Sequence, residues 1–540
     1  MDRSGPVPTS NEVDHVSHRH QGPRVSVPFV ASLLMFIAAC GQATPSAPPS
    51  TDPASSPSAA SVAPSIGPSA ATIASVGASL PACLDDATWR CLTVDVPIDR
   101  KDPSLGTIPI HAYVQSRTDL SDPPAEPIIV TPGGPGASIW RDHGWLPMAD
   151  WQANHDTVLI DPRGVGASGV IDCPELEAGA HDVSEVRAAA AACATKLGPA
   201  ADRYGAPDVA LDIEAVRDAL GIEAFDYYGA SYATVDQQAY AARFPERLHA
   251  LVLDSGFPQV DTLDGYFWGV DYPGASMRVL GLLCARDATC AKAHPDPRAE
   301  IGGLAARIRK EPIVAKNSLD VPVTINEGAI AMLTSLLGRQ DWQLSAGDLL
   351  DAAAAAQHGS PDKLAQLVND HPTWSGGGGG DIAGFSQGDN AAAQCVDGAF
   401  PWDPADAPDV RAKKFDAALK ALPDTAFAPF SAEGWASGYL SFLALCFDWP
   451  APKHIEPIIP DVTALASIPT LILSGELDLS APTEVNKPLQ TLFPQAPFVV
   501  VAGAGHDAAA PFMGACGGPV VAKFFDTLKA DPGACSTPPR

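Results

Sequence analysis

Three residues, in the chain order Ser231, Asp478 and His506, have the types and the settings that a hydrolytic site needs. Ser231 lies in the run 226–234, Asp-Tyr-Tyr-Gly-Ala-Ser-Tyr-Ala-Thr, where an apolar strand breaks at a glycine and a helix begins. This pattern predicts a nucleophile elbow, the sharp strand-to-helix turn that exposes a serine hydroxyl. The order serine, acid, histidine is that of the α/β-hydrolase triad.

Each residue of this set has a definite chemical task. A histidine can remove the proton that makes serine hydroxyl a weak nucleophile, and a carboxylate fixes the histidine tautomer. Asp478 and His506 each follow a buried, strand-like run, so both are expected at the C-terminal edge of the sheet. Glu476 is the alternative acid, and Asp478 could instead cap its loop.

A glycine-rich loop follows another predicted strand, at 132–136 with the sequence Pro-Gly-Gly-Pro-Gly. Such a loop lets backbone N–H groups approach a developing oxyanion. We expect the oxyanion hole to consist of the N–H groups of Tyr232 and Gly134. Neither a P-loop nor a dinucleotide fingerprint follows the loop, which argues against a nucleotide-binding site.

Strand-like runs alternate with helical stretches along the folded part, which predicts an α/β fold. We expect an α/β-hydrolase with a mostly parallel, eight-stranded sheet flanked by helices, its first two strands forming an antiparallel hairpin at one edge. The expected strands are 92–97, 107–114, 127–131, 157–161, 225–228, 250–254, 470–474 and 498–502.

The sheet does not need the residues between its sixth and seventh strands. We therefore expect residues 81–255 to form the first part of the hydrolase core, residues 256–462 a helical cap, and residues 463–540 the second part of the core. The cap segment is rich in alanine and leucine at helical spacing and contains a five-glycine run at 376–380. That run predicts a flexible loop.

Several motifs together resemble a known family. The loop 132–136 is similar to the H-G-G-P-G loop of prolyl iminopeptidases, and 161–168 is similar to their D-x-R-G-x-G-x-S segment. With 228–234, 244–247 and the acid and histidine segments, the chain from about Cys83 onward resembles the secreted tripeptidyl aminopeptidases, relatives of the prolyl iminopeptidases. Departures are Pro132 for histidine, Ala233 for glycine, Asp254-Ser255-Gly256 where a D-G pair is more typical, and Asp236-Gln237 for Leu-Gly, the last bearing on substrate preference.

The resemblance implies an exported serine exopeptidase without a cofactor or metal, which releases short peptides, tripeptides among them, from free N-termini through an acyl-enzyme. It implies that Arg163 supports the site by pairing with nearby carboxylates. It also nominates Asp397 as part of a carboxylate device for the substrate's ammonium group. One alternative is a carboxylesterase or lipase acting on cell-envelope esters, and another is a non-catalytic lipoprotein that binds peptides.

The N-terminus predicts export. Basic residues precede the apolar stretch 25–39, which is too short for a transmembrane helix and ends Ala-Ala-Cys40-Gly. Residues 1–40 are thus expected to be a lipoprotein signal peptide, with Cys40 lipidated at the outer face of the cytoplasmic membrane, from which the protein could be shed; an ordinary signal peptide is the alternative. Residues 41–80 are mainly Ala, Pro and Ser and predict a disordered tether.

The other ten cysteines are an even number, which in an exported chain indicates disulfides. Pairing of nearest neighbours gives Cys83–Cys91, Cys173–Cys193, Cys284–Cys290, Cys395–Cys446 and Cys516–Cys535. No spacing is typical of a zinc site or a redox C-x-x-C pair. The net charge of −29 argues against nucleic acid as a partner and leaves the lipid as the only expected membrane contact.

Overall fold

The computed structural model describes residues 79–537 except 121–123, 180–182, 260–268, 339–343, 372–380, 424 and 454–455. The chain divides into two compact units, Met1–Gly67 and Pro68–Arg540, and the first lies wholly outside the described residues. The predicted signal peptide, Cys40, nearly all of the tether and the five-glycine run also lie outside them. The second unit contains the predicted sheet, the cap and all three residues of the predicted triad.

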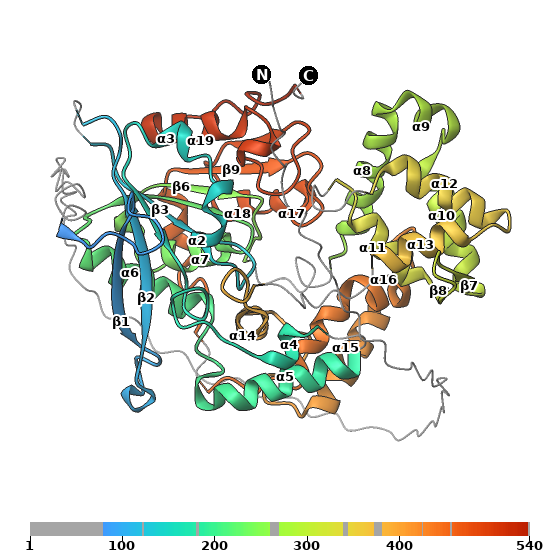
Figure 1. Cartoon of the computed structure of the whole chain (residues 1–540), viewed down its shortest axis with the longest axis horizontal. Helices are drawn as coiled ribbons and strands as arrows, with labels where there is room; N and C mark the ends of the chain where they lie inside the picture. Colours follow the sequence, from blue (N-terminus) through green and yellow to red (C-terminus); the bar gives the residue numbers. More distant parts are fainter. Residues whose placement is uncertain are drawn as a thin grey trace, which may run out of the picture. The chain divides into compact units, whose positions relative to one another are not determined.

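This unit contains an eight-stranded sheet in the order β1-β2-β4-β3-β5-β6-β9-β10. Figure 1 labels β1, β2, β3, β6 and β9 of this sheet. β1 pairs antiparallel with β2, and β2 pairs antiparallel with β4, whereas all further neighbours are parallel. The predicted fold, including the edge hairpin, is confirmed. The strands are β1 (Arg90–Pro97), β2 (Thr107–Gln115), β3 (Ile128–Thr131), β4 (Thr157–Ile160), β5 (Phe225–Ala230), β6 (Leu248–Asp254), β9 (Thr470–Gly475) and β10 (Phe498–Val501).

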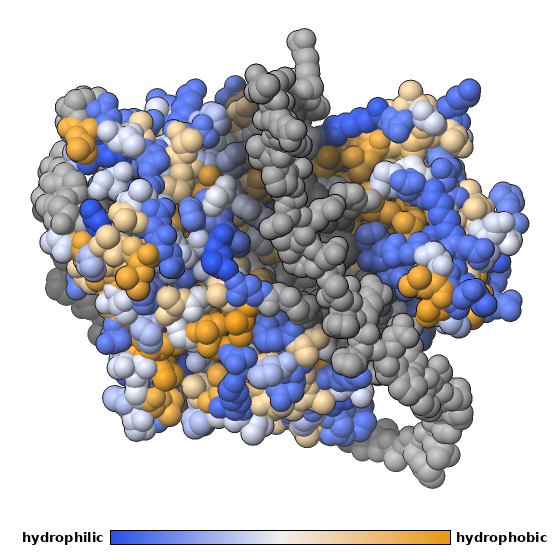
Figure 2. Space-filling model, viewed as in Figure 1, coloured by the Kyte–Doolittle hydropathy of each residue, from blue (hydrophilic) through white to orange (hydrophobic). Residues whose placement is uncertain are grey.

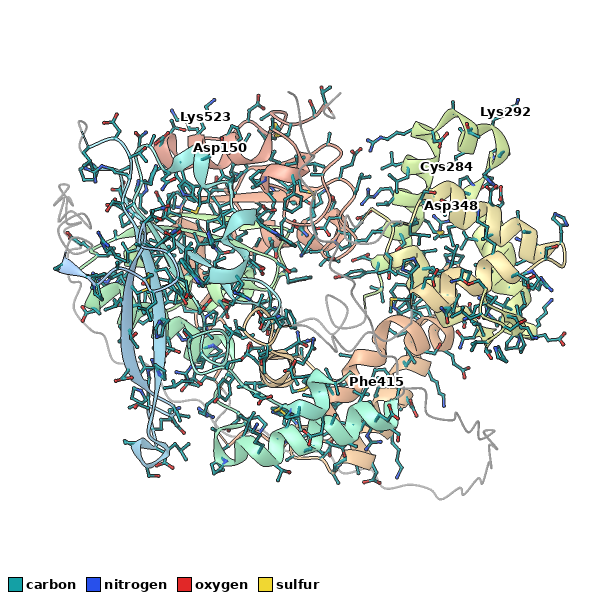
Figure 3. The ribbon with its side chains drawn as sticks, viewed as in Figure 1. Asp150, Cys284, Lys292, Asp348, Phe415 and Lys523 are labelled. Atoms are coloured by element: carbon teal, nitrogen blue, oxygen red, sulfur yellow. A yellow bond between two sulfur atoms is a disulfide. The ribbon has the colours of Figure 1, made fainter. Side chains whose placement is uncertain are left out.

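Helices cover both faces of the sheet, and successive strand residues pack into different layers. Tyr227 of β5 belongs to the hydrophobic cluster under α6 and α7, whereas Tyr228 belongs to the cluster under α2, α3 and α19. This alternation explains why the central strands are continuous apolar runs. The face helices are α2 (Ile139–Asp142), α3 (Met148–Trp151), α6 (Ala206–Ala219), α7 (Ala233–Ala241) and α19 (Gly517–Thr527). Helices α3 and α19 pack together. Figure 3 labels Asp150 on α3 and Lys523 on α19.

We use the word cap for the elements between β6 and β9. Its helices are α8 (Tyr272–Arg286), α9 (Ala288–Ala293), α10 (Pro297–Lys310), α11 (Glu327–Ser335), α12 (Ala346–Gln357), α13 (Asp362–Asp370), α14 (Gln387–Asp397), α15 (Pro408–Ala421), α16 (Ala432–Gly438) and the 3-10 helices η5 (Tyr439–Cys446) and η6 (Val462–Ser467). α4 (Pro174–Glu177) and α5 (Val183–Leu197), which precede β5, pack against α14 and η5.

The cap also contains a two-stranded antiparallel sheet, which the prediction of a helical cap missed. It is formed by β7 (Ile313–Lys316) and β8 (Pro322–Ile325). Ile313 and Ala315 are buried while the residues between and after them are exposed, so this segment follows a period of two. The Asn317 side chain stabilises the connecting turn by accepting hydrogen bonds from the N–H groups of Leu319 and Val321.

Five disulfides join the same five pairs that nearest-neighbour pairing gives. Cys284, labelled in Figure 3, bonds Cys290 and links α8 to α9. Cys395 of α14 bonds Cys446 at the end of η5, so this bridge links two cap elements across a sequence separation of 51 residues. Hydrophilic side chains are spread across the face seen in Figure 2, with hydrophobic ones in small separate patches. Within the described ranges, no helix combines the length and apolar character needed to cross a membrane.

Candidate active site

Ser231 stands at a sharp turn between β5 and α7, as the elbow pattern predicts. Its φ of 58° lies in the left-handed region, which a non-glycine residue enters only at a cost in free energy. Its N–H donates to the Asp254 carbonyl at 2.9 Å, and its own carbonyl accepts from Thr234 Oγ1 at 2.7 Å. These two hydrogen bonds hold the strained turn.

The unusual Ala233 of the elbow is accommodated by a glycine in the strand. A Cβ built on Gly229 would lie only 2.9 Å from the Ala233 Cβ and 2.8 Å from Cδ of Gln237. Gln237 in turn donates from Nε2 to the carbonyls of Tyr227 and Val252. An alanine is therefore tolerated at position 233 because position 229 has no side chain.

Asp478 and His506 meet beyond the ends of β9 and β10. Asp478 is completely buried, and its Oδ2 lies 2.9 Å from His506 Nδ1. Its Oδ1 accepts hydrogen bonds from the N–H groups of Ser480 and Ala481, at 2.8 and 2.9 Å. The carboxylate is thus fixed by its own loop and leaves His506 Nε2 as the nitrogen that can serve a nucleophile.

The alternative acid, Glu476, has other partners. Its Oε2 accepts from Arg286 and from the N–H of Gly503, both at 2.7 Å. The structure therefore brings Asp478, and not Glu476, into contact with the histidine.

Asp254, at the end of β6, links the serine to the histidine loop, and it was not among the predicted site residues. Its carbonyl accepts from the Ser231 N–H, while its carboxylate accepts from the N–H groups of Ala508 and Ala509 and from Tyr228 Oη, each at 2.9 Å. Burial raises the pKa of Asp254 to about 6, and nearby Asp507 adds to the effect. An acid at the end of a buried strand was the signal that could have identified it.

The turns beside Asp254 and His506 are also joined to each other. Ser255 and Asp507 have φ values of 51° and 60°. The N–H of Asp507 donates to Ser255 Oγ at 3.2 Å, and Asp507 Oδ1 lies 3.8 Å from His506 Nε2. The backbone that follows the histidine is therefore held by Asp254 at the end of β6 and by the adjacent Ser255.

The glycine-rich loop lies against the serine through Gly133. A Cβ built on Gly133 would be 2.8 Å from Ser231 Cβ and 3.3 Å from Ser231 Oγ. Gly134, the expected donor, has a φ of 111°, and a Cβ there would meet the next turn of its own loop. Gly134 as the donor stays a prediction, and Gly133 is the loop residue that contacts the nucleophile.

The cap supports the glycine-rich loop from behind. The Ser386 N–H donates to the Gly136 carbonyl at 2.8 Å, and Asn390 Nδ2 donates to the Pro135 carbonyl at 2.8 Å. Both donors belong to the start of α14. The position of this loop thus depends on the cap.

Arg163 is buried behind the site and pairs with a carboxylate, as the resemblance implies. Its Nε and Nη2 donate to the two oxygens of Asp212 at 2.7 and 2.8 Å, and its Nη1 donates to the carbonyls of Ile98 and Arg203. The guanidinium N–H groups of Arg163 therefore bind a carboxylate and backbone carbonyls of the fold.

Asp397, the candidate for the ammonium group, lies one contact from the elbow. Its Oδ2 accepts from Tyr232 Oη and from the Ala206 N–H at the start of α6, both at 2.9 Å. Burial raises its pKa to about 7. Two further acids nearby, Asp236 and Asp389, are almost completely buried and were not nominated as site residues.

The cap also contacts the loop that carries Asp478. Tyr272 Oη of α8 donates to the Ser480 carbonyl at 2.9 Å, and a Cβ on Gly338 would lie 2.8 Å from the Leu477 carbonyl oxygen.

In the described part of the chain, no three His, Cys, Asp or Glu side chains are placed to hold a metal ion.

Two family models match the chain. The model described as alpha/beta hydrolase fold matches residues 126–293, and the one described as TAP-like protein matches residues 430–535. The first match includes Ser231 and the glycine-rich loop, and the second includes Asp478 and His506.

Individual relatives are similar to the chain at low identity. Serine protease Hip1 of Mycobacterium tuberculosis is 24% identical over 423 residues, covering 72% of this chain and 76% of the relative. The tripeptidyl aminopeptidase of Streptomyces lividans is 28% identical over 187 residues, covering 31% of this chain and 35% of the relative. A solved proline iminopeptidase of Mycobacterium smegmatis is 17% identical with a TM-score of 0.34, covering 81% and 98% of the two chains.

Proposed function

We propose, given that the chain belongs to the α/β-hydrolase serine peptidases with a TAP-like domain, that it releases short peptides, tripeptides among them, from free N-termini. The observation that carries the assignment of roles is the 2.9 Å contact between Asp478 Oδ2 and His506 Nδ1, in a chain whose Ser231 occupies a strained elbow. The relatives' names support a peptidase.

In the proposed reaction, Ser231 Oγ attacks the carbonyl carbon of the scissile peptide bond while His506 accepts the hydroxyl proton. The C–N bond then breaks, and His506 returns the proton to the departing amine. Water, deprotonated by His506, then attacks the acyl-serine ester. The bond between the acyl carbon and Ser231 Oγ breaks, His506 returns the proton to Oγ, and the short peptide leaves as a free acid. Asp478 stabilises the imidazolium, and the N–H groups of Tyr232 and the glycine-rich loop bind the oxyanion.

A fluorophosphonate probe tests the nucleophile. The wild-type protein should be labelled on Ser231, and Ser231→Ala should abolish labelling and turnover without loss of fold. The exposed cap serine in Ser318→Ala is the matched control and should be without effect. If Ser231→Ala is still labelled at the same rate, the assignment is wrong.

A substrate panel tests the reaction class. Peptides with free N-termini, the same peptides acetylated, and simple acyl esters should be compared by kcat/KM. We expect the free peptides to exceed the acetylated ones by at least about a hundredfold, because a buried ammonium partner left unpaired is costly. Equal cleavage of blocked peptides or esters would support the carboxylesterase alternative instead.

We further propose that Asp397 contributes to recognition of the substrate's ammonium group. The support is its contact with Tyr232 Oη, next to the nucleophile, and its position on cap helix α14. Asp397→Asn should narrow the difference between free and acetylated peptides, whereas Asp416→Asn, at an exposed position of α15, should not. An unchanged difference in Asp397→Asn would leave the residue with a structural role alone.

We also propose that the protein is exported and anchored through lipid on Cys40. The signal pattern supports this, as do five disulfides, which form in oxidising compartments. Mass spectrometry of the mature N-terminus should find diacylglycerol on Cys40, and Cys40→Ala should release the protein to the medium or leave it unprocessed. An unmodified start at another residue would contradict the anchor.

A further inference from the structure

A small cavity lies behind the elbow and the glycine-rich loop, on the side of α14. It is lined by Gly133, Gly136, Arg163, Tyr232, Asp236 and Asp389, among others. Its volume is about 20 Å³, which is enough for one water molecule. The cavity therefore separates α7, which carries Asp236, from α14, which carries Asp389.

The two carboxylates that face this cavity have few partners. Asp236 is 5% exposed and Asp389 is 4% exposed. Among the described residues, Asp236 has no hydrogen bond or ion pair through its carboxylate, and Asp389 Oδ1 has no hydrogen-bond partner. A buried carboxylate without a partner is costly when it is ionised.

No spare positive charge in the described part of the chain faces the pair. The Arg163 guanidinium lines the cavity, but it already forms a bidentate pair with Asp212. Asp397 of α14 acts on both acids as a further negative charge. Asp208 of α6 acts in turn on Asp397. Tyrosine hydroxyls are the other titratable groups around the acids in the described residues. They are those of Tyr204 on the loop before α6, of Tyr227 on β5, and of Tyr232, which lines the cavity and donates to Asp397.

These surroundings favour the protonated form. Burial, with Asp397 as a secondary cause, raises the pKa of both Asp236 and Asp389 well above that of an ordinary aspartic acid. Both shifts favour a proton held by the pair, as is common for two acids in one site.

The pair stands between the two halves of the oxyanion hole. Asp236 follows Tyr232 by one turn on α7, so it is part of the helix that presents the Tyr232 N–H. Asp389 belongs to the first turn of α14, whose Ser386 and Asn390 hold the glycine-rich loop. A change in the separation of the two acids would change the separation of the two halves.

We propose that Asp236 and Asp389 are positioning residues that share a proton across the cavity, directly or through one water molecule, and so fix the two halves of the oxyanion hole. This inference rests on the proposed function, because it takes Tyr232 and the loop as oxyanion donors. Loss of the shared proton leaves two buried negative charges that repel each other. The oxyanion donors then separate, which weakens transition-state stabilisation more than substrate binding.

The pH dependence of kcat and KM tests the pair, with any substrate that the enzyme cleaves, an ester included. Wild-type kcat should fall reversibly at alkaline pH by about tenfold or more, with KM changed less than about twofold. In Asp236→Asn and Asp389→Asn, the amide can hydrogen-bond to the remaining carboxyl group in either protonation state. Relative to its own kcat at neutral pH, each variant should lose less kcat at alkaline pH than the wild type loses.

Several outcomes would overturn the proposal. One is an alkaline loss of kcat in Asp236→Asn and Asp389→Asn that is as large as the loss in the wild type. The control Asp416→Asn should show the wild-type loss. Another needs no variant: a wild-type loss that appears in KM, or that is irreversible. A third is relief of the loss by Ca²⁺ or Na⁺ and its return on chelation or dialysis, because a cation would then occupy the cavity. If no substrate is turned over but the probe labels Ser231, the rate of labelling replaces kcat.

Discussion

Gly133 packs so closely against Ser231 that its missing side chain is part of the site. A Cβ at Gly133 would be 2.8 Å from Ser231 Cβ and 3.0 Å from the Ala230 carbonyl oxygen. Neither atom can retreat, because the Ser231 backbone is already strained and anchored at both its N–H and its carbonyl. Gly133→Ala should therefore displace the nucleophile and lower kcat by at least about a hundredfold.

The control for this prediction is Gly144→Ala. Gly144 lies in the same stretch of chain, and a Cβ there would meet nothing within 4 Å. It should leave kcat and the melting temperature unchanged. Equal activity in Gly133→Ala and Gly144→Ala would show that the loop approaches the serine less closely than these distances require.

The assignment of the acid can be checked by two amide variants. Asp478→Asn removes the charge that orients His506 and should lower kcat by on the order of a thousandfold or more. Glu476→Gln keeps most of the shape of a side chain that binds Arg286 and Gly503, and it should affect stability more than turnover. Steady-state kinetics would contradict the assignment if Glu476→Gln were crippling and Asp478→Asn mild.

Asp254→Asn should impair catalysis through the histidine loop. Each carboxylate oxygen of Asp254 accepts two hydrogen bonds. In the Asn variant one of these oxygens becomes an NH₂ group, which cannot accept the hydrogen bonds that the oxygen accepted. We expect a loss of about 1–3 kcal/mol in stability and about tenfold or more in kcat, with KM little changed. Chemical denaturation and kinetics measure the two effects. Wild-type kcat in this variant would mean that the loop is held by other contacts.

Stability should decrease as pH rises above acidic values. Burial raises the pKa values of Asp161, Asp208, Asp226 and Asp254 to about 6 and that of Asp397 to about 7. Because these groups have a pKa near 3.9 when unfolded, the folded state holds more protons between about pH 4 and pH 7. The free energy of unfolding contributed by these groups therefore falls as pH rises through that window.

Calorimetry should accordingly find a higher melting temperature at pH 5 than at pH 8. The net charge of −29 acts in the same direction, because self-repulsion is relieved as acids are protonated. Asp254→Asn removes one of the five titrations and should make the difference smaller. A melting temperature that rises from pH 5 to pH 8 would show that the exposed acids with lowered pKa values dominate.

The sheet could be predicted from the sequence because its strands carry their own signal. The runs at β3 and β9 are buried on both faces, and each is bounded by turn residues, so hydrophobicity alone locates them. The elbow at Ser231 could also be predicted from the sequence. A glycine is needed at position 229, because a Cβ there would collide with Ala233. The second sheet of the cap had a period-two signal too, but the surrounding alanine-rich helices obscured it.

The supporting contacts of the site could not be predicted in the same way. Asp254 acts through hydrogen bonds to Ala508 and Ala509, more than 250 residues further along the chain. Asp236 and Asp389 face one cavity only because α14 of the cap returns to the back of the elbow helix. Such pairings depend on tertiary packing, and no local pattern of residue types records them.

The order of the strands along the chain determines when the enzyme can become active during synthesis. β9 pairs with β6 in the sheet, yet the entire cap is translated between them. A nascent chain that ends within the cap therefore holds Ser231 without its base, and the outer edge of β6 lacks its neighbour. Under the proposed roles, the peptidase cannot attack other proteins on the ribosome or during export until its last strands have emerged and paired.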